Sequence, residues 1–219
     1  AFNIGRKVVS DPHWIDTINL YRSGSLASNP ILSSEALSLI DLISPDEELR
    51  KILEYRTQEL IEYQNLSYAK EYMNFVGNIF KKEQKTRSSS ELSQNVAKYL
   101  FKLMATKDEY EVARLSLKAE LDTAISQEFG KSAKISYMLH PPFLKAMENI
   151  PILNMLPGVK SKLALGSWFK VFYVILKNMK FLRGTPFDFM AWFSNDVRKA
   201  DRKALNHYKS ILTKNIDEI

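Results

Sequence analysis

The sequence contains no cysteine at any of its 219 positions. Disulfide bridges, thiolate zinc sites and cysteine-held iron–sulfur clusters are therefore excluded within these residues. Glycine is also scarce, with 7 residues, and neither GxGxxG nor GxxxxGK(S/T) occurs, so no dinucleotide- or phosphate-binding loop is indicated. The lack of disulfides favours an intracellular, cytoplasmic location, although it does not establish one.

The chain also lacks the residue patterns that typically mark a catalytic or metal site. His13, His140 and His207 lie far apart and do not have metal-ligand spacing. His140 precedes two prolines, a position more typical of a structural than of a catalytic histidine. No Gly-x-Ser-x-Gly elbow is present, and acidic pairs such as Asp108-Glu109 sit in charged helical contexts. We predict no catalytic residue, metal site or cofactor site in this chain by itself.

No apolar run is long and uninterrupted enough to predict a membrane span. The most apolar stretch, Leu163–Leu182, is interrupted by Lys170, Lys177 and Lys180, and a charge near the middle of a span costs about 2.5–3.5 kcal/mol. The three lysines fall on one helical face, so the stretch predicts an amphipathic helix that packs on the core. The alternative is a helix lying on a membrane surface.

Basic residues are in excess, because 31 Lys and Arg residues oppose 25 Asp and Glu residues for a formal net charge of +6. Residues 41–62 lean acidic, whereas Lys160 to Lys214 carry a clear excess of Lys and Arg. A basic surface attracts nucleic acid, anionic lipid or an acidic protein, and the sign of the charge does not choose among them.

Apolar residues recur every three or four positions through most of the chain, which is the spacing of amphipathic helices. The sequence therefore predicts a mainly α, multi-helix globular domain with at most a short extended segment near residues 134–139. Lys81–Ser90 is polar and predicts an exposed loop or a frayed helix end. Further helix signals are a helix at Pro12–Tyr21, a cap at Ser33 or Ser34, one helix or two from Ser44 to Phe75, a helix end at Phe129-Gly130 and a last helix at Ser194–Ile216.

The stretch Asn95–Leu115 has the pattern around which we expect the rest of the chain to be arranged. Its apolar residues predict a helix with a broad apolar stripe, but Lys107, Asp108, Glu109 and Arg114 are unusual companions for so apolar a run. Charges of this kind most often form a solvated face. The alternative is that they are held at a contact between domains.

The same stretch resembles a known family. The segment YLFKLMATKDEYEVARL (99–115) is close to a run, NLFKLMAYKDEYEVARL, found in the C-terminal helical domain of the long-chain indolepyruvate ferredoxin oxidoreductases, which are thiamine-diphosphate-dependent enzymes. Three more segments match in the same order, namely YQNLSYAKEY (63–72), the HPP of MLHPPFL (140–142) and LRGTPFD (182–188). His140 departs from the Ala usual in that family, and Phe189–Trp192 departs from its usual helix entry.

The resemblance implies that the chain is the end of a larger polypeptide, with residues 1–25 as a tail of a preceding domain or a linker and 26–219 as the C-terminal helical domain. The parent enzyme would decarboxylate a 2-oxoacid oxidatively, using thiamine diphosphate, Mg²⁺ and an iron–sulfur cluster held by domains outside this chain. The expected partners are the thiamine- and CoA-binding domains, an acidic ferredoxin as electron acceptor, and further copies in a homo-oligomer.

Within that family the chain itself would be non-catalytic and would support domain assembly or dock an electron acceptor. The candidate domain-contact residues are Lys107, Asp108, Glu109, Arg114 and Arg183. The alternative function is a freestanding basic module that binds nucleic acid or an anionic membrane surface.

Overall fold

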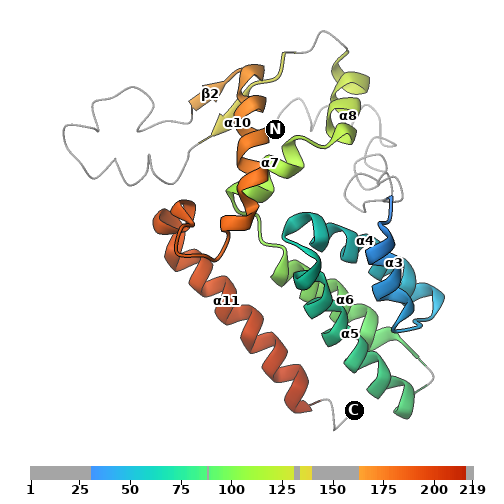
Figure 1. Ribbon diagram of the computed structural model, residues 1–219. Coiled ribbons are helices and arrows are strands. Elements are labelled where there is room, and N and C mark those ends of the chain that lie inside the picture. Colours follow the sequence, from blue (N-terminus) through green and yellow to red (C-terminus); the bar gives the residue numbers. More distant parts are fainter. Residues whose placement is uncertain (1–30, 88, 131–133, 140–162, 216–219) are drawn as a thin grey trace, which may run out of the picture.

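The computed structural model (Figure 1) describes residues 31–87, 89–130, 134–139 and 163–215. Most of these residues are helical, which confirms the predicted mainly α, multi-helix fold. The helix predicted at Pro12–Tyr21 and the residue His140 lie outside the described residues. The division of the chain near residue 25 falls there too, and it stays a prediction.

Two helices open the described chain, and the first begins at a cap that the sequence predicts. Helix α3 (Ser34–Asp41) starts after Ser33, whose hydroxyl accepts a hydrogen bond from the backbone N–H three residues on, at 3.2 Å. Helix α4 (Glu47–Tyr63) starts after Asp46, whose carboxylate accepts the equivalent N–H at 2.9 Å. Such caps satisfy a backbone donor that has no partner within the helix.

The predicted long segment from Ser44 to Phe75 consists of two helices rather than one. The chain leaves the helical conformation at Gln64, and Asn65 caps helix α5 (Leu66–Thr86) by accepting a backbone N–H at 2.9 Å. Helices α4 and α5 pack against each other, as expected for helices joined by so short a connection.

The polar segment Lys81–Ser90 contains a buried carboxylate, so the prediction of an exposed loop or frayed end is wrong at Glu83. Helix α5 continues to Thr86, and Glu83 accepts the backbone N–H groups of Leu92 and Ser93 at 2.9 Å each, together with the Ser93 hydroxyl. Glu83 therefore caps the following helix, α6 (Glu91–Met104), from a neighbouring helix. Composition alone does not reveal a cap supplied from such a distance.

Helices α3 to α6 enclose the larger of two apolar cores. Full burial of each aliphatic or aromatic side chain stabilises the fold by about 1.5–3 kcal/mol. The buried hydroxyl of Tyr72 donates to the carbonyl of Ala97 at 2.9 Å, so its burial leaves no unsatisfied donor. The core residues include Ile40, Leu49, Leu53, Leu60, Tyr72, Met73, Val76, Val96, Leu100 and Met104.

The helix predicted across Asn95–Leu115 is wrong, because the chain breaks between Met104 and Glu109. Helix α6 ends at Met104, and helix α7 (Glu109–Ser116) restarts after Asp108, whose carboxylate accepts the Glu111 N–H at 2.9 Å. The capping geometry of Asp108 overrides the helical spacing of the apolar residues.

A further helix, α8 (Ala119–Phe129), follows α7 and ends where the sequence predicts. Gly130 adopts a φ of 83°, which a residue with a side chain rarely adopts. The predicted extended segment is also confirmed, since strand β1 (Tyr137–Leu139) lies within residues 134–139.

The apolar stretch Leu163–Leu182 is not the single helix that its spacing predicts. It begins with strand β2 (Leu163–Leu165), which pairs antiparallel with β1. Helical structure follows in three successive elements, which are η2 (Ser167–Phe169), α10 (Lys170–Asn178) and η3 (Met179–Leu182). The pairing of β1 with β2 is a contact between distant segments, which a local periodicity cannot reveal.

The last helix, α11 (Phe189–Asn215), begins five residues earlier than predicted and runs along one side of the molecule in Figure 1. A second, smaller core lies beneath α10, and its buried residues are Tyr110, Ala113, Tyr173, Leu176 and Met190. Helix α11 contributes to both cores, with Met190 in the second and Leu205, Tyr208 and Leu212 packed on the first. None of the described helices combines the length and hydropathy needed to cross a membrane.

Candidate functional site

The connection between α6 and α7 lies where the two cores meet, and Asp108 is the residue that organises it. In addition to capping α7, the Asp108 carboxylate accepts two hydrogen bonds from Arg183, from Nε at 2.5 Å and from Nη2 at 2.8 Å. This bidentate pair is the strongest arrangement of a guanidinium and a carboxylate. It joins the start of α7 to the turn that follows η3.

Arg183 extends the contact to the end of α4. Its Nη1 donates to the backbone carbonyl of Tyr63 at 2.5 Å and to Oε1 of Gln64 at 2.8 Å. The guanidinium carbon also lies 3.8 Å from the centre of the Tyr63 ring, which is a cation–π contact. Burial by itself would lower the pKa of Arg183, but the hydrogen bonds to Asp108 outweigh it and raise the pKa, so the guanidinium stays charged.

Asp188 is a fully enclosed acceptor at the start of α11. Its carboxylate accepts hydrogen bonds from the Tyr110 hydroxyl at 2.9 Å, from Nη1 of Arg198 at 2.7 Å and from the backbone N–H groups of Gly184 and Ala191. A buried charge is tolerated when it is paired and its oxygens are satisfied in this way. Burial, followed by the hydrogen bond to Asp188, raises the pKa of Tyr110, so the phenol remains protonated.

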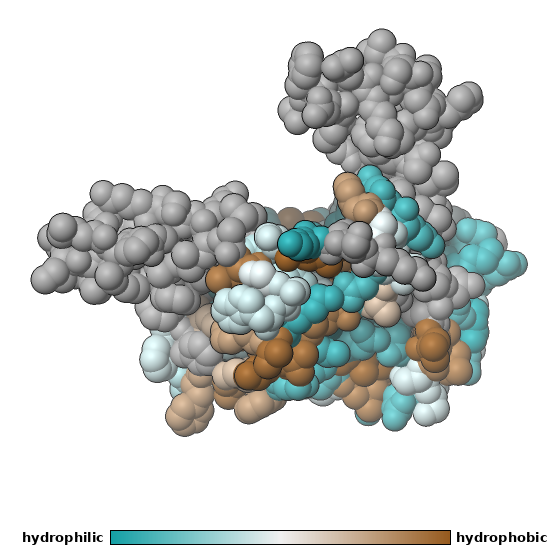
Figure 2. Space-filling view, turned by 90° about the horizontal axis from the view of Figure 1, so that it is seen from above, coloured by the Kyte–Doolittle hydropathy of each residue, from teal (hydrophilic) through white to brown (hydrophobic). Residues whose placement is uncertain are grey.

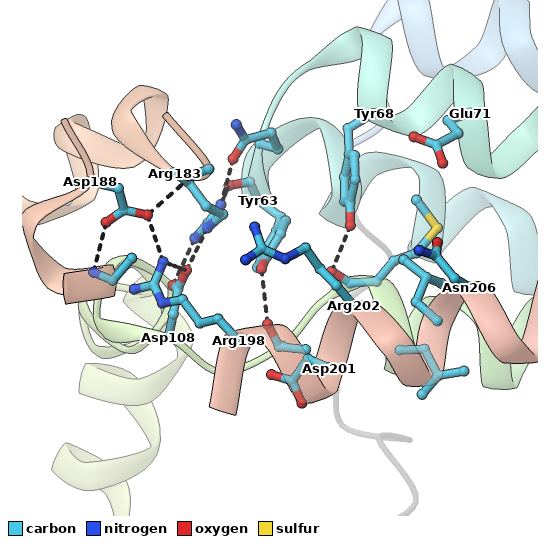
Figure 3. A pocket seen from close by; sticks show the side chains of 17 residues that line it. Tyr63, Tyr68, Glu71, Asp108, Arg183, Asp188, Arg198, Asp201, Arg202 and Asn206 are labelled. Carbon is cyan, nitrogen blue, oxygen red and sulfur yellow. Dashed lines mark hydrogen bonds and ion pairs between the residues drawn. The ribbon is translucent and has the colours of Figure 1, made fainter. Parts of the chain in front are cut away.

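Arg198 closes the network around these residues. It binds Asp188 and also Glu109, whose carboxylate lies 2.9 Å from its Nη2. Figure 3 shows the Asp108 carboxylate close to the guanidinium groups of both Arg183 and Arg198, with Asp188 beside Arg198. We call this set the central network, and it consists of Asp108, Glu109, Tyr110, Arg183, Asp188 and Arg198.

A second set of charges lies one turn further along α7 and centres on Arg114, which is 5% exposed. Its guanidinium binds Glu59 at 2.6 Å, Glu62 at 2.7 Å and Glu111 at 2.8 Å. Lys118 adds a second cation to Glu59 at 2.5 Å. Burial alone would raise the pKa of Glu59, but hydrogen bonds from Lys118 and Arg114 lower it below its usual value. We call this set the Arg114 network, and it fastens α7 to α4.

A pocket of about 380 Å³ opens beside the central network, between α11 and the ends of α4, α5 and α6. Tyr63 and Tyr68 form one wall with their rings stacked at 5.9 Å between centroids. Arg202 extends toward these tyrosines from α11 (Figure 3). The tyrosine hydroxyls are already engaged, because Tyr68 donates to the Met104 carbonyl at 3.0 Å and Tyr63 lies 3.4 Å from the Thr106 hydroxyl.

The chemistry of these groups is that of a structural contact. The carboxylates of Asp108 and Asp188 are occupied by arginines and backbone donors, and burial raises the pKa values of Tyr63 and Tyr68. A general acid or base needs a pKa near the working pH and a proton within reach of a substrate. Within the described ranges no group of three or more acidic or histidine side chains could hold a metal ion.

The predicted domain-contact residues divide into three groups. Asp108, Glu109 and Arg183 come together in the central network, and Arg114 forms the second network. Lys107 is exposed, as expected for a residue of a solvated face. No finding bears on contacts with other domains, so that assignment remains a prediction.

Sequence reasoning missed Tyr63, Tyr110, Asp188 and Arg198 as members of the site. Asp188 carried a usable signal, since an Asp that follows a Pro-containing turn and precedes a helix is a good N-cap. Tyr110 carried none, because its partner Asp188 lies 78 residues away. Arg198 binds Asp188, ten residues away, and Glu109, 89 residues away, and neither spacing is a recognised pattern.

Three of the four segments that resemble the oxidoreductase family meet at this site. Tyr63 and Gln64 belong to the first, Asp108 to the second, and Arg183 and Asp188 to the third. The fourth segment, residues 140–142, lies outside the described residues. The residues that carry the resemblance are therefore largely the residues that hold the two cores together.

The fold and the site define a helical domain of two apolar cores joined by buried ion pairs. Residues 49–219 match the model of a family of unknown function, DUF6537, which covers most of the chain, and the chain belongs to that family. No significant match was found among curated proteins or among solved structures.

Proposed function

We propose that this chain is the C-terminal helical domain of a thiamine-dependent 2-oxoacid oxidoreductase of the indolepyruvate type, and that it supports the assembly of that enzyme without taking part in the chemistry. The observation that carries the proposal is the convergence at one site of three family-like segments, 63–72, 99–115 and 182–188. Four ordered sequence matches are already specific. The meeting of three of them at one buried network gives those three a common structural purpose.

The nature of the network supports a structural rather than a catalytic part. Arginines and backbone groups already occupy the carboxylates of Asp108 and Asp188, and the pKa of Tyr110 is raised. The thiamine diphosphate, Mg²⁺ and iron–sulfur cluster of the parent enzyme would be held by other domains. Electron transfer to a ferredoxin would likewise start from those domains.

The alternative of a freestanding module for nucleic acid or an anionic membrane ranks second, because many cations of the basic region are already engaged. Lys170 binds Asp122 and Lys209 binds Glu71, while Arg183 and Arg198 belong to the central network. Phosphate binding depends on the number of cations that contact the polyanion, and these pairs reduce that number.

The test is to purify the native protein that carries this sequence and to assay it. We expect peptide mapping to find thiamine-binding domains in the same polypeptide, and the purified protein to reduce viologen dye in a reaction that needs an aryl or branched 2-oxoacid and CoA. Native protein that ends at this chain, shows no such reduction and binds DNA in a steeply salt-dependent manner would refute the proposal.

A further inference from the structure

Helix α10 is apolar on two opposite sides, but only one of them is covered. Every residue from Val171 to Leu176 is apolar. Tyr173 and Leu176 are buried on the side that packs against α7. A helix that is apolar all round is normally enclosed by protein, so the second side lacks the cover that its composition calls for.

The uncovered side is a continuous surface, which we call the outer face of α10. At 100° per residue Val171 and Ile175 lie opposite Tyr173 and Leu176, and Val174 and Phe172 lie on the two flanks. Trp168, in the turn just before the helix, is 67% exposed and Val171 is 68% exposed. The outer face consists of Trp168, Val171, Phe172, Val174 and Ile175, all of which are exposed.

The size of the outer face is that of a protein contact. Five such side chains present roughly 500 Å² of apolar area, since one buried aromatic side chain alone accounts for about 150–250 Å². The largest apolar patch on a typical monomer is about 300–600 Å² and is often functional. One side of a standard protein interface covers about 800 Å², so the outer face would supply more than half of one. Figure 2 shows that hydrophobic and hydrophilic residues lie side by side on the face seen from above.

Charge decides what covers the outer face. No Asp or Glu occurs between residues 166 and 187, and Lys177 is exposed beside Val174, three positions away along the helix. A second copy of the chain would bring the same patch against itself, so the exposed Lys177 of each copy would meet a surface without an unpaired carboxylate, since Asp122 already binds Lys170. A complementary partner therefore has an apolar centre and carboxylates at its edge.

An anionic bilayer fits this surface less well than a protein does. Lys170 is paired with Asp122, and Nζ of Lys180 donates to the backbone carbonyls of Ile61 and Glu62. Recognition of anionic lipid depends on clusters of about 4–8 uncommitted cations. Among the described residues of this stretch, Lys177 is the lysine that has no ion pair or hydrogen bond.

We infer that the outer face of α10 is the surface by which this domain docks onto a neighbouring domain of the same enzyme, against an apolar patch bordered by carboxylates. This inference rests on the proposed function and adds the contact surface to it. It also moves the docking role away from Asp108, Arg114 and Arg183, whose charges are used inside the chain. Burial of exposed apolar groups at an interface lowers the free energy of association, whereas charges that are already paired inside the chain contribute little to it.

The experiment is carbene footprinting of the intact native protein, with labelling of each residue referred to the same protein in urea. The labelling of Trp168 should fall roughly tenfold or more, because the centre of an interface is packed like a protein interior. Its exposed fraction would drop from the 67% of the chain alone toward the 3% of Tyr173. Labelling that stays near two thirds of its value in urea would overturn the inference.

Variants make the test specific to the outer face. The double substitution Val171→Asp and Ile175→Asp in the intact protein should restore labelling of Trp168. The matched control is Val197→Asp, which introduces the same charge at a valine of 64% exposure on α11 and should leave Trp168 protected. Equal effects of the two variants would contradict a role for this face.

A photo-crosslinker at position 175 identifies the occupant. Crosslinks to an apolar, carboxylate-bordered segment outside these 219 residues support the inference. Crosslinks to position 175 of another copy, or flotation with phosphatidylserine vesicles that the double variant abolishes, would overturn it. Crosslinking to such a segment in a protein without 2-oxoacid oxidoreductase activity would refute the proposed function but keep the surface. 2-Oxoacid oxidoreductase activity in a protein whose Trp168 is still accessible would support the proposed function but refute the docking surface.

Discussion

Replacement of Arg183 by alanine should destabilise the chain more than removal of any exposed arginine. The Arg183 side chain is 12% exposed and its partner Asp108 is 8% exposed. The variant loses the bidentate pair with Asp108, two hydrogen bonds to the end of α4 and the contact with the Tyr63 ring. Removal of one partner from a buried ion pair costs about 3–5 kcal/mol.

The expected loss lies at the lower end of that range. Without Arg183, Asp108 keeps the backbone N–H of Glu111 and has Arg198 at 3.9 Å as a second cation. We therefore expect the free energy of unfolding to fall by about 3 kcal/mol. For a chain of this size the melting temperature would fall by about 6–12 °C. Thermal and urea unfolding followed by circular dichroism measure both quantities.

Arg50→Ala is the matched control. Arg50 also contacts two carboxylates, Asp41 and Glu54 at 3.0 Å each, but its side chain is 36% exposed. Exposed pairs contribute about 0–1 kcal/mol. A double-mutant cycle of Arg183→Ala with Asp108→Ala should give a coupling energy above about 1.5 kcal/mol. If Arg183→Ala costs no more than Arg50→Ala, the central network does not hold the two cores together and the reasoning fails.

Three further predictions concern other parts of the fold. The pKa of Glu59 is lowered in the folded chain from about 4.5, so its contribution is present above that pH and is lost as the pH falls through the folded value. Glu59→Gln should therefore flatten the loss of stability in acid, and an unchanged acid limb in urea titrations would contradict this. Glu83→Ala leaves the buried N–H and hydroxyl of Ser93 without an acceptor, and should cost about 1–3 kcal/mol, whereas Glu91→Ala, at an exposed site, should cost little. Leu100→Ala empties part of the first core and should cost about 2–5 kcal/mol; a loss below 1 kcal/mol in calorimetry would contradict the placement of Leu100 there.

The features that the sequence predicted correctly depend on neighbouring residues. Ser33 and Gly130 act within one turn of a helix end, and the structure confirms both. The alternating residues before Leu139 likewise predicted an extended segment that is present as β1.

The features that it did not predict depend on distant partners. Strand β2 forms because β1 lies beside it, although the residues Leu163–Leu165 fit a helical pattern equally well. The sequence around Asp108 was compatible both with a charged residue inside a helix and with a helix cap. The burial of Asp108 is explained by its pairing with Arg183, 75 residues away. The location of the site thus followed from tertiary pairing, even though most of its charged residues had been singled out.

Helix α11 has a consequence for how the molecule opens. Its 27 residues extend about 40 Å, enough to reach from Met190 in the second core to Leu212 against the first. Detachment of α11 would expose both apolar cores to water at the same time. The slowest-exchanging amides of α5 and of α10 should therefore share a single opening free energy, as members of one cooperative unit rather than two.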